Sequence, residues 1–396
     1  MRGRNRPRVR ILRILGGVAA VLIGLAAAGF GWAYRSTGTS LAARGIVWGG
    51  SQYDDWKRFP SRVVAGGQAP VTFRLEENDF FDDLTIEEVP LQAYLEQTNT
   101  TAFLVVRDDA LLFEGYFNGS DRAATQPSFS MSKSFASTLL AIAVDEGFVG
   151  GLDDPVTSYL PELLERDPRF KAITLRHLVQ MTSGLRFDPD VNEPFSDDFV
   201  TSHAPDLRQA ALNAPIVEPP GQRFLYNDYN PILIGMVLER ATGMSVSDYL
   251  STRLWDPMGA EADGSWDLDS ERSGLERMSV GLNGRAVDLA KLGWLFLHGG
   301  RNGDRQVVPQ AWVEAITQRT DAVYTGRGEH EDYYLHYWWL DTSNDAYFAE
   351  GGFGQAIYVY PAADLVLVRL GKDTGGVYWT GLLGEIATWL AGKMDA

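Results

Sequence analysis

Ser130 and Lys133 have the types and the spacing that a nucleophile and its partner need. They open and close the run Ser130-Met131-Ser132-Lys133, and residues three apart on a helix share one face, with Cβ atoms about 5–6 Å apart. A serine hydroxyl is a poor nucleophile until a neighbouring base takes its proton. A buried lysine could be that base if desolvation lowers its pKa. Alone, this S-x-x-K pattern is weak, because a capping serine beside a solvated lysine gives the same letters.

A second group of residues, Tyr226-Asn227-Asp228, offers another base. A phenol near a lysine ammonium loses its proton unusually easily, so Tyr226 could also activate the serine. Tyr229 competes for this role. The alternative is a turn tyrosine that packs beneath its own loop.

The third group is the glycine-rich run Gly351-Gly352-Phe353-Gly354-Gln355. Glycines let a substrate or another backbone approach a strand edge closely. A backbone N–H group from such a strand could complete an oxyanion hole. By itself, the run would be an ordinary glycine turn.

Hydrophobic periodicity predicts the elements that must position these groups. Strands are expected over 101–106 and 111–117, joined by a turn at Asp108-Asp109, and again over 356–360 and 365–370. Helices are expected over 131–146, 174–181, 231–242, 287–297 and about 382–390. This order predicts an α/β fold of the α+β type, in which helices flank an antiparallel sheet and a mostly helical region, about 155–285, is inserted.

In this order, the three groups resemble those of class C β-lactamases and penicillin-binding proteins. The chain is more similar still to the subgroup that includes 6-aminohexanoate-dimer hydrolase and related esterases, over about residues 95 to 390. Supporting phrases are Leu152-Asp153-Asp154-Pro155-Val156, Ile173-Thr174-Leu175-Arg176-His177-Leu178, Thr182-Ser183-Gly184-Leu185 and Asp288-Leu289-Ala290-Lys291-Leu292-Gly293. The resemblance implies a β-lactamase/transpeptidase-like fold.

Residue by residue, the resemblance makes Ser130 the nucleophile, Lys133 its partner and Tyr226 the tyrosine of the family's Tyr-x-Asn motif. It also gives half of the oxyanion hole to the N–H group of Ser130. The other half falls on the third motif, with Gly352 as first choice and Gln355 as second.

Two departures from the family pattern bear on the substrate. Asp228 stands where asparagine is usual, so an acceptor replaces a donor amide. The family's third motif often opens with Lys or His, but neither occurs from Phe348 to Leu370, and in one register Glu350 takes that place. Because a lysine there commonly meets the carboxylate of a penicillin, we expect short-chain esters or linear amides to be better substrates than β-lactams.

Composition narrows the chemistry further. The absence of cysteine excludes a thiol nucleophile, a disulfide framework and an iron–sulfur cluster. The histidines show no metal-binding spacing, so neither a metal nor another cofactor is expected: His177, His203, His298, His330 and His336. His177 is expected to be structural, and the aromatic stretch 333–339 could line a cleft or form a core strand. A net charge of −17 argues against a nucleic-acid partner.

The N-terminus predicts a membrane partner. Six arginines fall within the first thirteen residues, and 14–34 carries no charge. At about 1.5 Å per residue, that stretch can cross a bilayer. We therefore expect a cytoplasmic segment (1–13), a transmembrane helix (14–34), a linker and extension (35–94) and an exported hydrolase domain (95–396). The alternative is a signal peptide cleaved after Ala26-Ala27-Ala28.

The sequence thus predicts a membrane-anchored serine hydrolase that works through an acyl-enzyme on Ser130. Its substrate would be a small linear amide, a short-chain ester or a peptide-like molecule. The alternatives are a catalytically silent penicillin-binding or sensor domain on the same fold, or a genuine β-lactamase or D-Ala-D-Ala carboxypeptidase.

Overall fold

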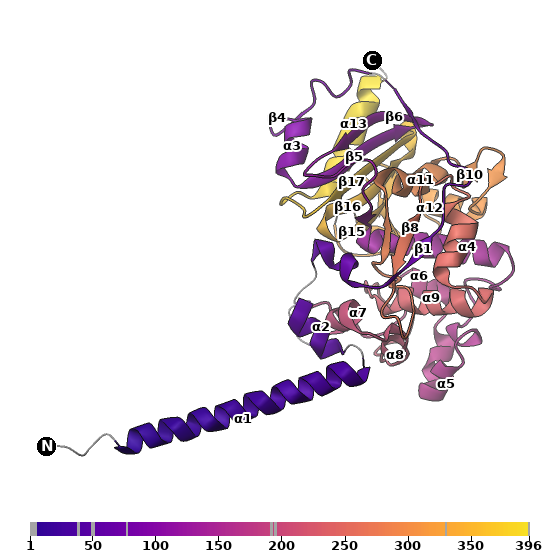
Figure 1. The fold of residues 1–396 in the computed structure, drawn as a ribbon. Coiled ribbons are helices and arrows are strands. Elements are labelled where there is room, and N and C mark those ends of the chain that lie inside the picture. Colours follow the sequence, from indigo (N-terminus) through magenta and orange to yellow (C-terminus); the bar gives the residue numbers. More distant parts are fainter. Residues whose placement is uncertain are drawn as a thin grey trace.

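The central sheet is built from both ends of the chain. The computed structural model describes residues 6–37, 40–48, 52–76, 78–190, 193, 196–328 and 331–394. Among these residues the nine-stranded sheet has the order β12 (Val323–Tyr324), β13 (Tyr333–Leu335), β14 (Trp338–Asp341), β15 (Ala346–Gly351), β16 (Gln355–Tyr360), β17 (Leu365–Gly371), β5 (Thr100–Arg107), β6 (Ala110–Tyr116) and β2 (Arg74–Leu75). The pairing is antiparallel throughout, except that β2 runs parallel to β6. Early and late strands meet where β17 pairs with β5 (Figure 1).

Two long helices cover opposite faces of this sheet. Gly293 of α11 (Ala286–Leu297) lies against Ile357 and Val359, whereas Gly384 of α13 (Trp379–Met394) lies against the Tyr358 hydroxyl. Successive side chains of a strand point to opposite faces, so the two helices must be on opposite sides of β16. The sheet is therefore buried on both faces.

Most other helices form a region below the sheet in Figure 1. They include α5 (Glu162–Arg166), α6 (Leu175–Val179), α7 (Asp197–His203), α8 (Leu207–Leu212) and α9 (Tyr229–Thr242). Both α4 (Ser132–Asp145) and α10 (Val246–Leu250) pack against α9. Elsewhere lie α1 (Arg6–Thr37), α2 (Leu41–Trp48), α3 (Leu91–Gln97) and α12 (Gln310–Thr317).

Short strands and turns connect these layers. The strands are β1 (Ser61–Val64), β3 (Thr85–Ile86), β4 (Val89–Pro90), β7 (Gln126–Pro127), β8 (Gly264–Asp267), β9 (Leu282–Gly284), β10 (Arg301–Asn302) and β11 (Arg305–Gln306). The tight helical turns are η1 (Tyr53–Arg58), η2 (Phe129–Met131), η3 (Val156–Ser158), η4 (Pro168–Ala172), η6 (Gly352–Gly354) and η7 (Pro361–Ala363). In addition, η5 (Ser251–Trp255) is a π-helical turn. A second sheet has the order β1-β8-β9-β7.

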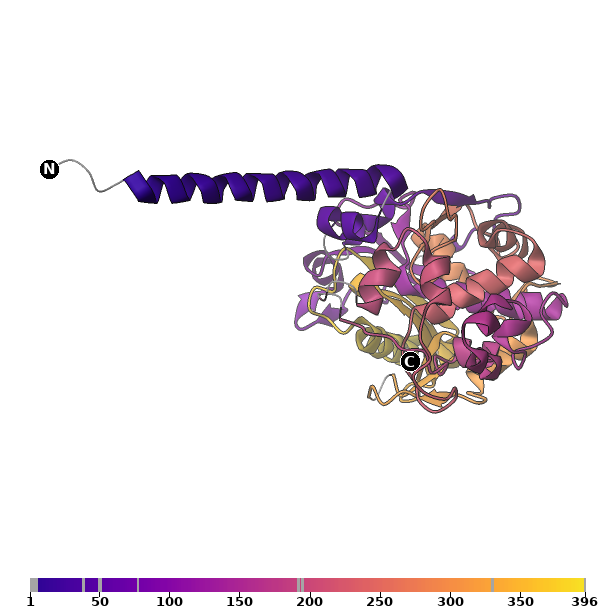
Figure 2. The ribbon, with the colours of Figure 1, turned by 90° about the horizontal axis from the view of Figure 1, so that it is seen from below.

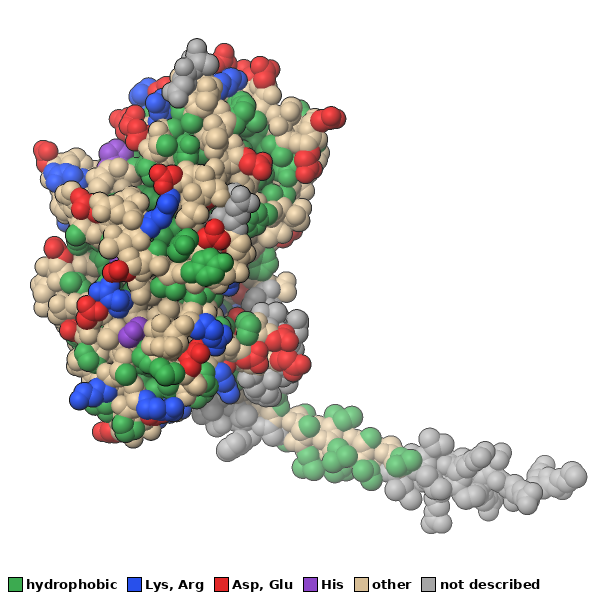
Figure 3. Space-filling view, turned by 180° about the vertical axis from the view of Figure 1, so that it is seen from behind, with side chains coloured by type: hydrophobic (Ala, Val, Ile, Leu, Met, Phe, Trp, Pro, Cys, Tyr) green, Lys and Arg blue, Asp and Glu red, His purple; other side chains and the backbone are tan. Residues whose placement is uncertain are grey.

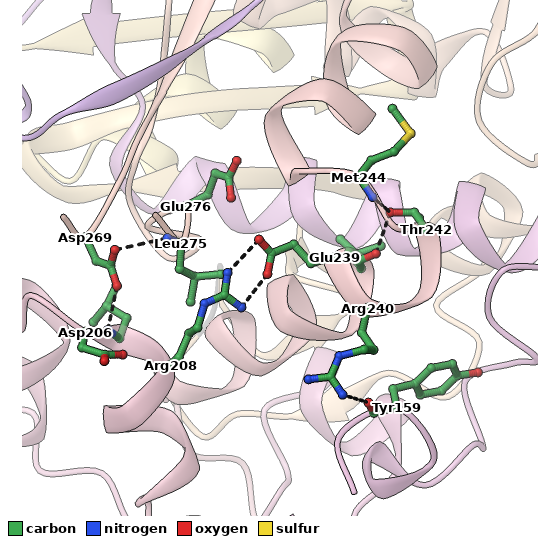
Figure 4. A network of polar contacts seen from close by, with 12 residues as sticks. Tyr159, Asp206, Arg208, Glu239, Arg240, Thr242, Met244, Asp269, Leu275 and Glu276 are labelled. Carbon is green, nitrogen blue, oxygen red and sulfur yellow. Dashed lines mark hydrogen bonds and ion pairs between the residues drawn. The ribbon is translucent and has the colours of Figure 1, made fainter. Parts of the chain in front are cut away.

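Charged side chains fix the helical region around α9 (Figure 4). Arg208 of α8 donates to Glu239 of α9 over 2.7 Å. Arg240 donates to the Tyr159 carbonyl over 3.3 Å. These contacts hold α9 in place, and Asp228 immediately precedes its first turn.

A buried arginine fixes the turn between β15 and β16. Arg369 of β17 is fully buried and donates to the carbonyl oxygens of Phe353, Gly354 and Thr98 at 2.7, 3.1 and 2.9 Å. Burial lowers the pKa of its guanidinium to about 9. These bonds satisfy carbonyl groups that would otherwise be buried without a partner.

Most predicted elements are confirmed, including the hairpin β5–β6 and the fold class. Thr174 caps α6, and Gly243 ends α9 in a left-handed conformation (φ 70°). Within the expected linker and extension (35–94), α2 begins at Leu41, β1 pairs with β8 and β2 joins the main sheet. These described elements therefore pack with the rest of the fold.

The predicted anchor lies within α1, which extends away from the body in Figure 2. Leu15, Leu22, Ile23 and Leu25 are exposed on it, and Figure 3 shows apolar side chains on the coloured part of this helix. Within the described ranges, no helix combines the length and apolar character that a membrane span requires. The anchor stays a prediction, and Arg2, Arg4 and His330 lie outside the described residues.

Candidate active site

Ser130 lies in η2, directly before α4. Its neighbour Phe129 has a left-handed backbone (φ 47°), and the Phe129 ring packs 4.9 Å from that of Phe353. A phenylalanine rarely adopts this conformation unless its surroundings impose it, and such strain is often found at functional sites. The turn presents Ser130 at the start of a helix, where backbone N–H groups have no partner within the helix.

The serines on either side of Ser130 are structural. Ser128 donates its hydroxyl to the Leu282 carbonyl over 2.6 Å, and Ser132 accepts from the Leu282 N–H over 3.0 Å. The hydroxyls of Ser128 and Ser132 are also 2.9 Å apart. This network fastens the start of α4 to β9.

Lys133 connects the first two sequence motifs. Its buried Nζ donates to Ser130 Oγ and to the Ser279 carbonyl, each over 3.0 Å. It also forms an ion pair of 2.9 Å with Asp228 Oδ1, and the lysine side chain is only 1% exposed. The spacing argument therefore placed Lys133 against Ser130 correctly.

The charge of Lys133 differs from what the sequence suggested. Burial works to lower its pKa, but the Asp228 carboxylate and Tyr226 outweigh burial, and the net pKa is raised above its ordinary value. The Asp228 carboxylate therefore favours the ammonium form of Lys133 over the neutral base that desolvation alone would give. The reason is that an opposite charge in direct contact favours the ammonium form more strongly than burial disfavours it.

Tyr226 lies beside this ammonium group. Lys133 Nζ is 4.7 Å from the centre of the Tyr226 ring, which stacks on Trp339 at 5.8 Å and 16°. Tyr229, the competing tyrosine, instead donates its buried hydroxyl to Asp197 over 2.9 Å. Of these two tyrosines, Tyr226 is the one that borders the same cavities as Ser130.

The glycine-rich motif brings a second backbone segment to the nucleophile. Gly351 ends β15, and a Cβ atom there would overlap the Ser128 carbonyl oxygen and lie 3.1 Å from the Ser130 nitrogen. Only glycine allows this approach. Gly352 follows in η6 and borders the same cavity as Ser130, which suits an N–H group of an oxyanion hole.

Gln355 has a different environment. Its side chain is fully buried, donates to the Gly371 carbonyl over 2.6 Å and accepts from the Gly371 N–H over 2.9 Å. It is absent from the described residues that line the cavity. The structure thus brings Gly352, but not the Gln355 side chain, to Ser130.

Ser130 opens into two adjoining cavities. The first, of about 390 Å³, is bordered by Tyr226, Trp339, Arg327 and Glu350. The second, of about 280 Å³, shares Ser130 and Tyr226 with the first. Together they leave room for substrate groups on both sides of the nucleophile.

Sequence reasoning missed several cavity residues, among them Trp56 of η1, Asp198 of α7 and Arg327. Burial and the nearby Asp228 raise the pKa of Asp198 to about 6, although Lys133 opposes them. None of these three residues belongs to a sequence motif whose spacing indicates catalysis. The local sequence therefore gave no signal that they line the cavity.

The two open questions about aromatic and histidine residues also receive answers. Trp339 borders the cavity while Tyr334, Tyr337 and Trp338 are buried, so the stretch 333–339 serves both cleft and core. His177 accepts the Thr174 N–H over 3.1 Å and does not border either cavity at Ser130. Among the described residues, no three acidic or histidine side chains form a group able to hold a metal ion.

Comparison with known proteins identifies the family. Residues 91–381 match the family model described as Beta-lactamase. The chain belongs to the Beta-lactamase family. The predicted resemblance is confirmed, and the protein is a serine hydrolase of this family.

Individual relatives agree with this assignment. 6-Aminohexanoate-dimer hydrolase of Paenarthrobacter ureafaciens is 27% identical over 333 residues, covering 80% of this chain and 84% of the relative. A Bacillus anthracis structure, provisionally named as the same hydrolase, superposes with a TM-score of 0.72 at 21% identity, covering 87% of this chain and 93% of the other. A penicillin-binding protein from Bacillus halodurans gives 0.59 at 19% identity, covering 75% and 99%. The latter two show that the fold is shared.

The close backbone approach at Gly351 leads to a prediction. Gly351→Ala should lower kcat/KM about a hundredfold, because the added methyl group pushes the glycine-rich turn away from Ser130, and loss of one oxyanion donor costs about 10²–10³ in rate. Steady-state hydrolysis of a p-nitrophenyl ester measures this.

Gly392→Ala is the matched control, since a Cβ atom there meets nothing within 4 Å. Wild-type kcat/KM in Gly351→Ala would contradict the assigned role of this turn.

Proposed function

We propose that this member of the Beta-lactamase family hydrolyses linear amides or short-chain esters through an acyl-enzyme on Ser130. The observation that carries the proposal is the position of Lys133 Nζ, 3.0 Å from Ser130 Oγ and 2.9 Å from Asp228. This contact fixes the serine hydroxyl and supplies a positive charge where an alkoxide would form.

In the first step, Ser130 Oγ attacks the substrate carbonyl carbon while ionised Tyr226 accepts the serine proton. Lys133 stays an ammonium group, which the raised pKa supports. The N–H groups of Ser130 and Gly352 stabilise the oxyanion. Tyr226 then gives its proton to the leaving amine or alcohol, the C–N or C–O bond breaks, and the acyl group remains on Ser130.

In the second step, a water molecule attacks the acyl-enzyme. Tyr226 takes one proton from the water and returns it to Ser130 Oγ as the acyl–oxygen bond breaks. The products are the free carboxylic acid and the regenerated serine. No metal or other cofactor takes part in this sequence.

The preference for linear amides or esters has two supports. The relative from Paenarthrobacter ureafaciens is named for a 6-aminohexanoate dimer. The third motif also lacks the Lys or His that often opens it in this family. A charge-assisted contact of that kind contributes about 1.5–3 kcal/mol, or roughly tenfold to a hundredfold in rate if made in the transition state.

We also propose that α1 anchors the protein and that the hydrolase domain lies outside the cytoplasm. The support is the basic N-terminal run, the uncharged stretch 14–34 and the exposed apolar side chains of α1.

The full chain should sediment with membranes after a high-salt wash and keep its N-terminus on sequencing. Deletion of 6–37 should release it. A soluble mature chain that begins near Gly29 would sink this proposal.

The nucleophile is tested by Ser130→Ala. Turnover should fall by about three orders of magnitude or more, and fluorophosphonate labelling should disappear, because no other group can form the acyl-enzyme. Lys133→Ala should lower turnover nearly as much as Ser130→Ala does. Tyr226→Phe should slow acylation or deacylation.

Mass spectrometry should place the label on the peptide that contains Ser130. Ser158→Ala, at an exposed serine, is the matched control. Labelling of wild-type protein without turnover would instead support a silent penicillin-binding or sensor domain. Full activity in Ser130→Ala would defeat the mechanism.

The charge of Lys133 is tested by Asp228→Asn. If the reaction needs the ammonium form, activity is lost as the pH rises through the Lys133 pKa. Removing the carboxylate leaves burial dominant, so this pKa falls and the alkaline limb of kcat/KM moves to lower pH. A pH profile of ester hydrolysis measures the shift.

Asp304→Asn, at an exposed carboxylate, should leave the profile unchanged. If Lys133 acted as a neutral base, Asp228→Asn would instead raise activity near neutral pH. If Asp228 itself took the serine proton, activity would vanish at every pH.

A further inference from the structure

We propose that Glu350 makes the active-site cleft select substrates that present an amine, and reject substrates that present a carboxylate, at the end beside the glycine-rich turn. This inference rests on the proposed function and names the substrate class of the same site. It assigns Glu350 as a specificity-determining residue, opposite in charge to the Lys or His that the family often has at the start of the third motif.

The position of Glu350 supports this role. It is the residue of β15 directly before Gly351, and it pairs in register with Ala356 of β16. Because Gly351 lies against the backbone of Ser130, the carboxyl group is carried on the same rigid hairpin as the oxyanion donor. Glu350 and Ser130 border one cavity of about 390 Å³. A small substrate bound at Ser130 therefore meets the Glu350 carboxyl group.

The charged side chains near Glu350 do not neutralise its carboxylate. Arg327 borders the cavity too, but its guanidinium stacks 4.7 Å from Trp339 and lies 3.6 Å from Glu331. Tyr378 also donates to Glu331 over 3.2 Å. Within the part of the chain that the structure describes, no cation forms an ion pair with Glu350, so its carboxylate, once ionised, borders the cavity without a counterion. Arg327 thus does not replace the family's missing cation.

The protonation state of Glu350 adds a pH dependence. Burial and Glu331 raise its pKa to about 7, while Arg327 opposes them. The charged and titratable groups around it are Glu331, Arg327 and Tyr378. As the pH rises through 7, the neutral carboxyl group becomes a carboxylate. Attraction of an ammonium group and repulsion of a carboxylate should therefore both grow from about pH 6 to about pH 8.

The experiment uses linear amides that differ only in one end group. Hexanoic-acid amides carry an ammonium, methyl or carboxylate group at the far end of the acyl half, and a second set carries them on the amine half. In one of the sets, the ammonium compound should exceed the carboxylate compound in kcat/KM by about tenfold to a hundredfold at pH about 8. The ratio should shrink at pH about 6.

Substitutions at Glu350 assign the effect. Glu350→Gln keeps the side-chain shape, so hydrolysis of the methyl compound should persist while the ammonium-to-carboxylate ratio falls to within about threefold of unity and loses its pH dependence. Glu350→Lys should invert the ratio and improve nitrocefin turnover. Glu314→Gln, at an exposed carboxylate on α12, is the matched control. Asp198→Asn tests the other cavity and should keep the ratio set by Glu350.

Two results would overturn the inference while leaving the proposed function intact. One is an unchanged ammonium-to-carboxylate ratio in Glu350→Gln, and the other is a wild-type preference for the carboxylate compounds. Failure of the proposed function looks different: the wild-type protein would hydrolyse none of the amides or esters, and Ser130 would remain unlabelled by fluorophosphonate.

Discussion

A buried ammonium group held between a serine hydroxyl and a carboxylate is the interaction on which the rest of this site depends. Burying a lysine costs several kcal/mol unless a counterion and hydrogen-bond acceptors compensate it. Here Asp228 supplies the opposite charge. Ser130 Oγ and the Ser279 carbonyl accept hydrogen bonds from the same ammonium group. The contact is possible only because α4 and the start of α9 converge on one point. The ion pairs that fix α9, such as Arg208 with Glu239, therefore support the site indirectly.

The same contact decides how the chemistry is divided. With an amide at position 228, burial would lower the pKa of Lys133 without an opposing carboxylate. Asp228 instead raises this pKa and keeps the lysine charged. A charged Lys133 cannot accept the serine proton, so Tyr226 takes that role in the proposed mechanism. Lys133 then acts as a fixed positive charge whose geometry is set before the substrate arrives, which is the arrangement that stabilises a developing anion most effectively.

The sheet supplies the opposite wall of the cleft. The β15–β16 hairpin carries Glu350, Gly351 and Gly352 in succession, and Arg369 holds its turn through buried carbonyl groups. Backbone contact at Gly351 fixes the distance between this wall and Ser130. The residue next to Gly351 can consequently vary in charge without disturbing the oxyanion donor. In the proposed function, this separation lets the fold keep its acyl-transfer chemistry while the charge at position 350 sets which substrates it prefers.

The sequence alone determined the fold class, most elements and the residues Ser130, Lys133 and Tyr226, because helix periodicity, strand patterning and motif spacing are local properties of the chain. It also placed a glycine-rich turn near Ser130 but left its register open, and the structure shows that the Gln355 side chain bonds to Gly371. Only the tertiary structure decided the charge of Lys133 and the presence of Trp56, Asp198 and Arg327 around Ser130. A pKa depends on burial and on charges a few ångströms away in space, and the lining of a cleft depends on how distant loops pack. Neither the pKa of Lys133 nor the lining of the cleft can be predicted from the spacing of residues along the chain.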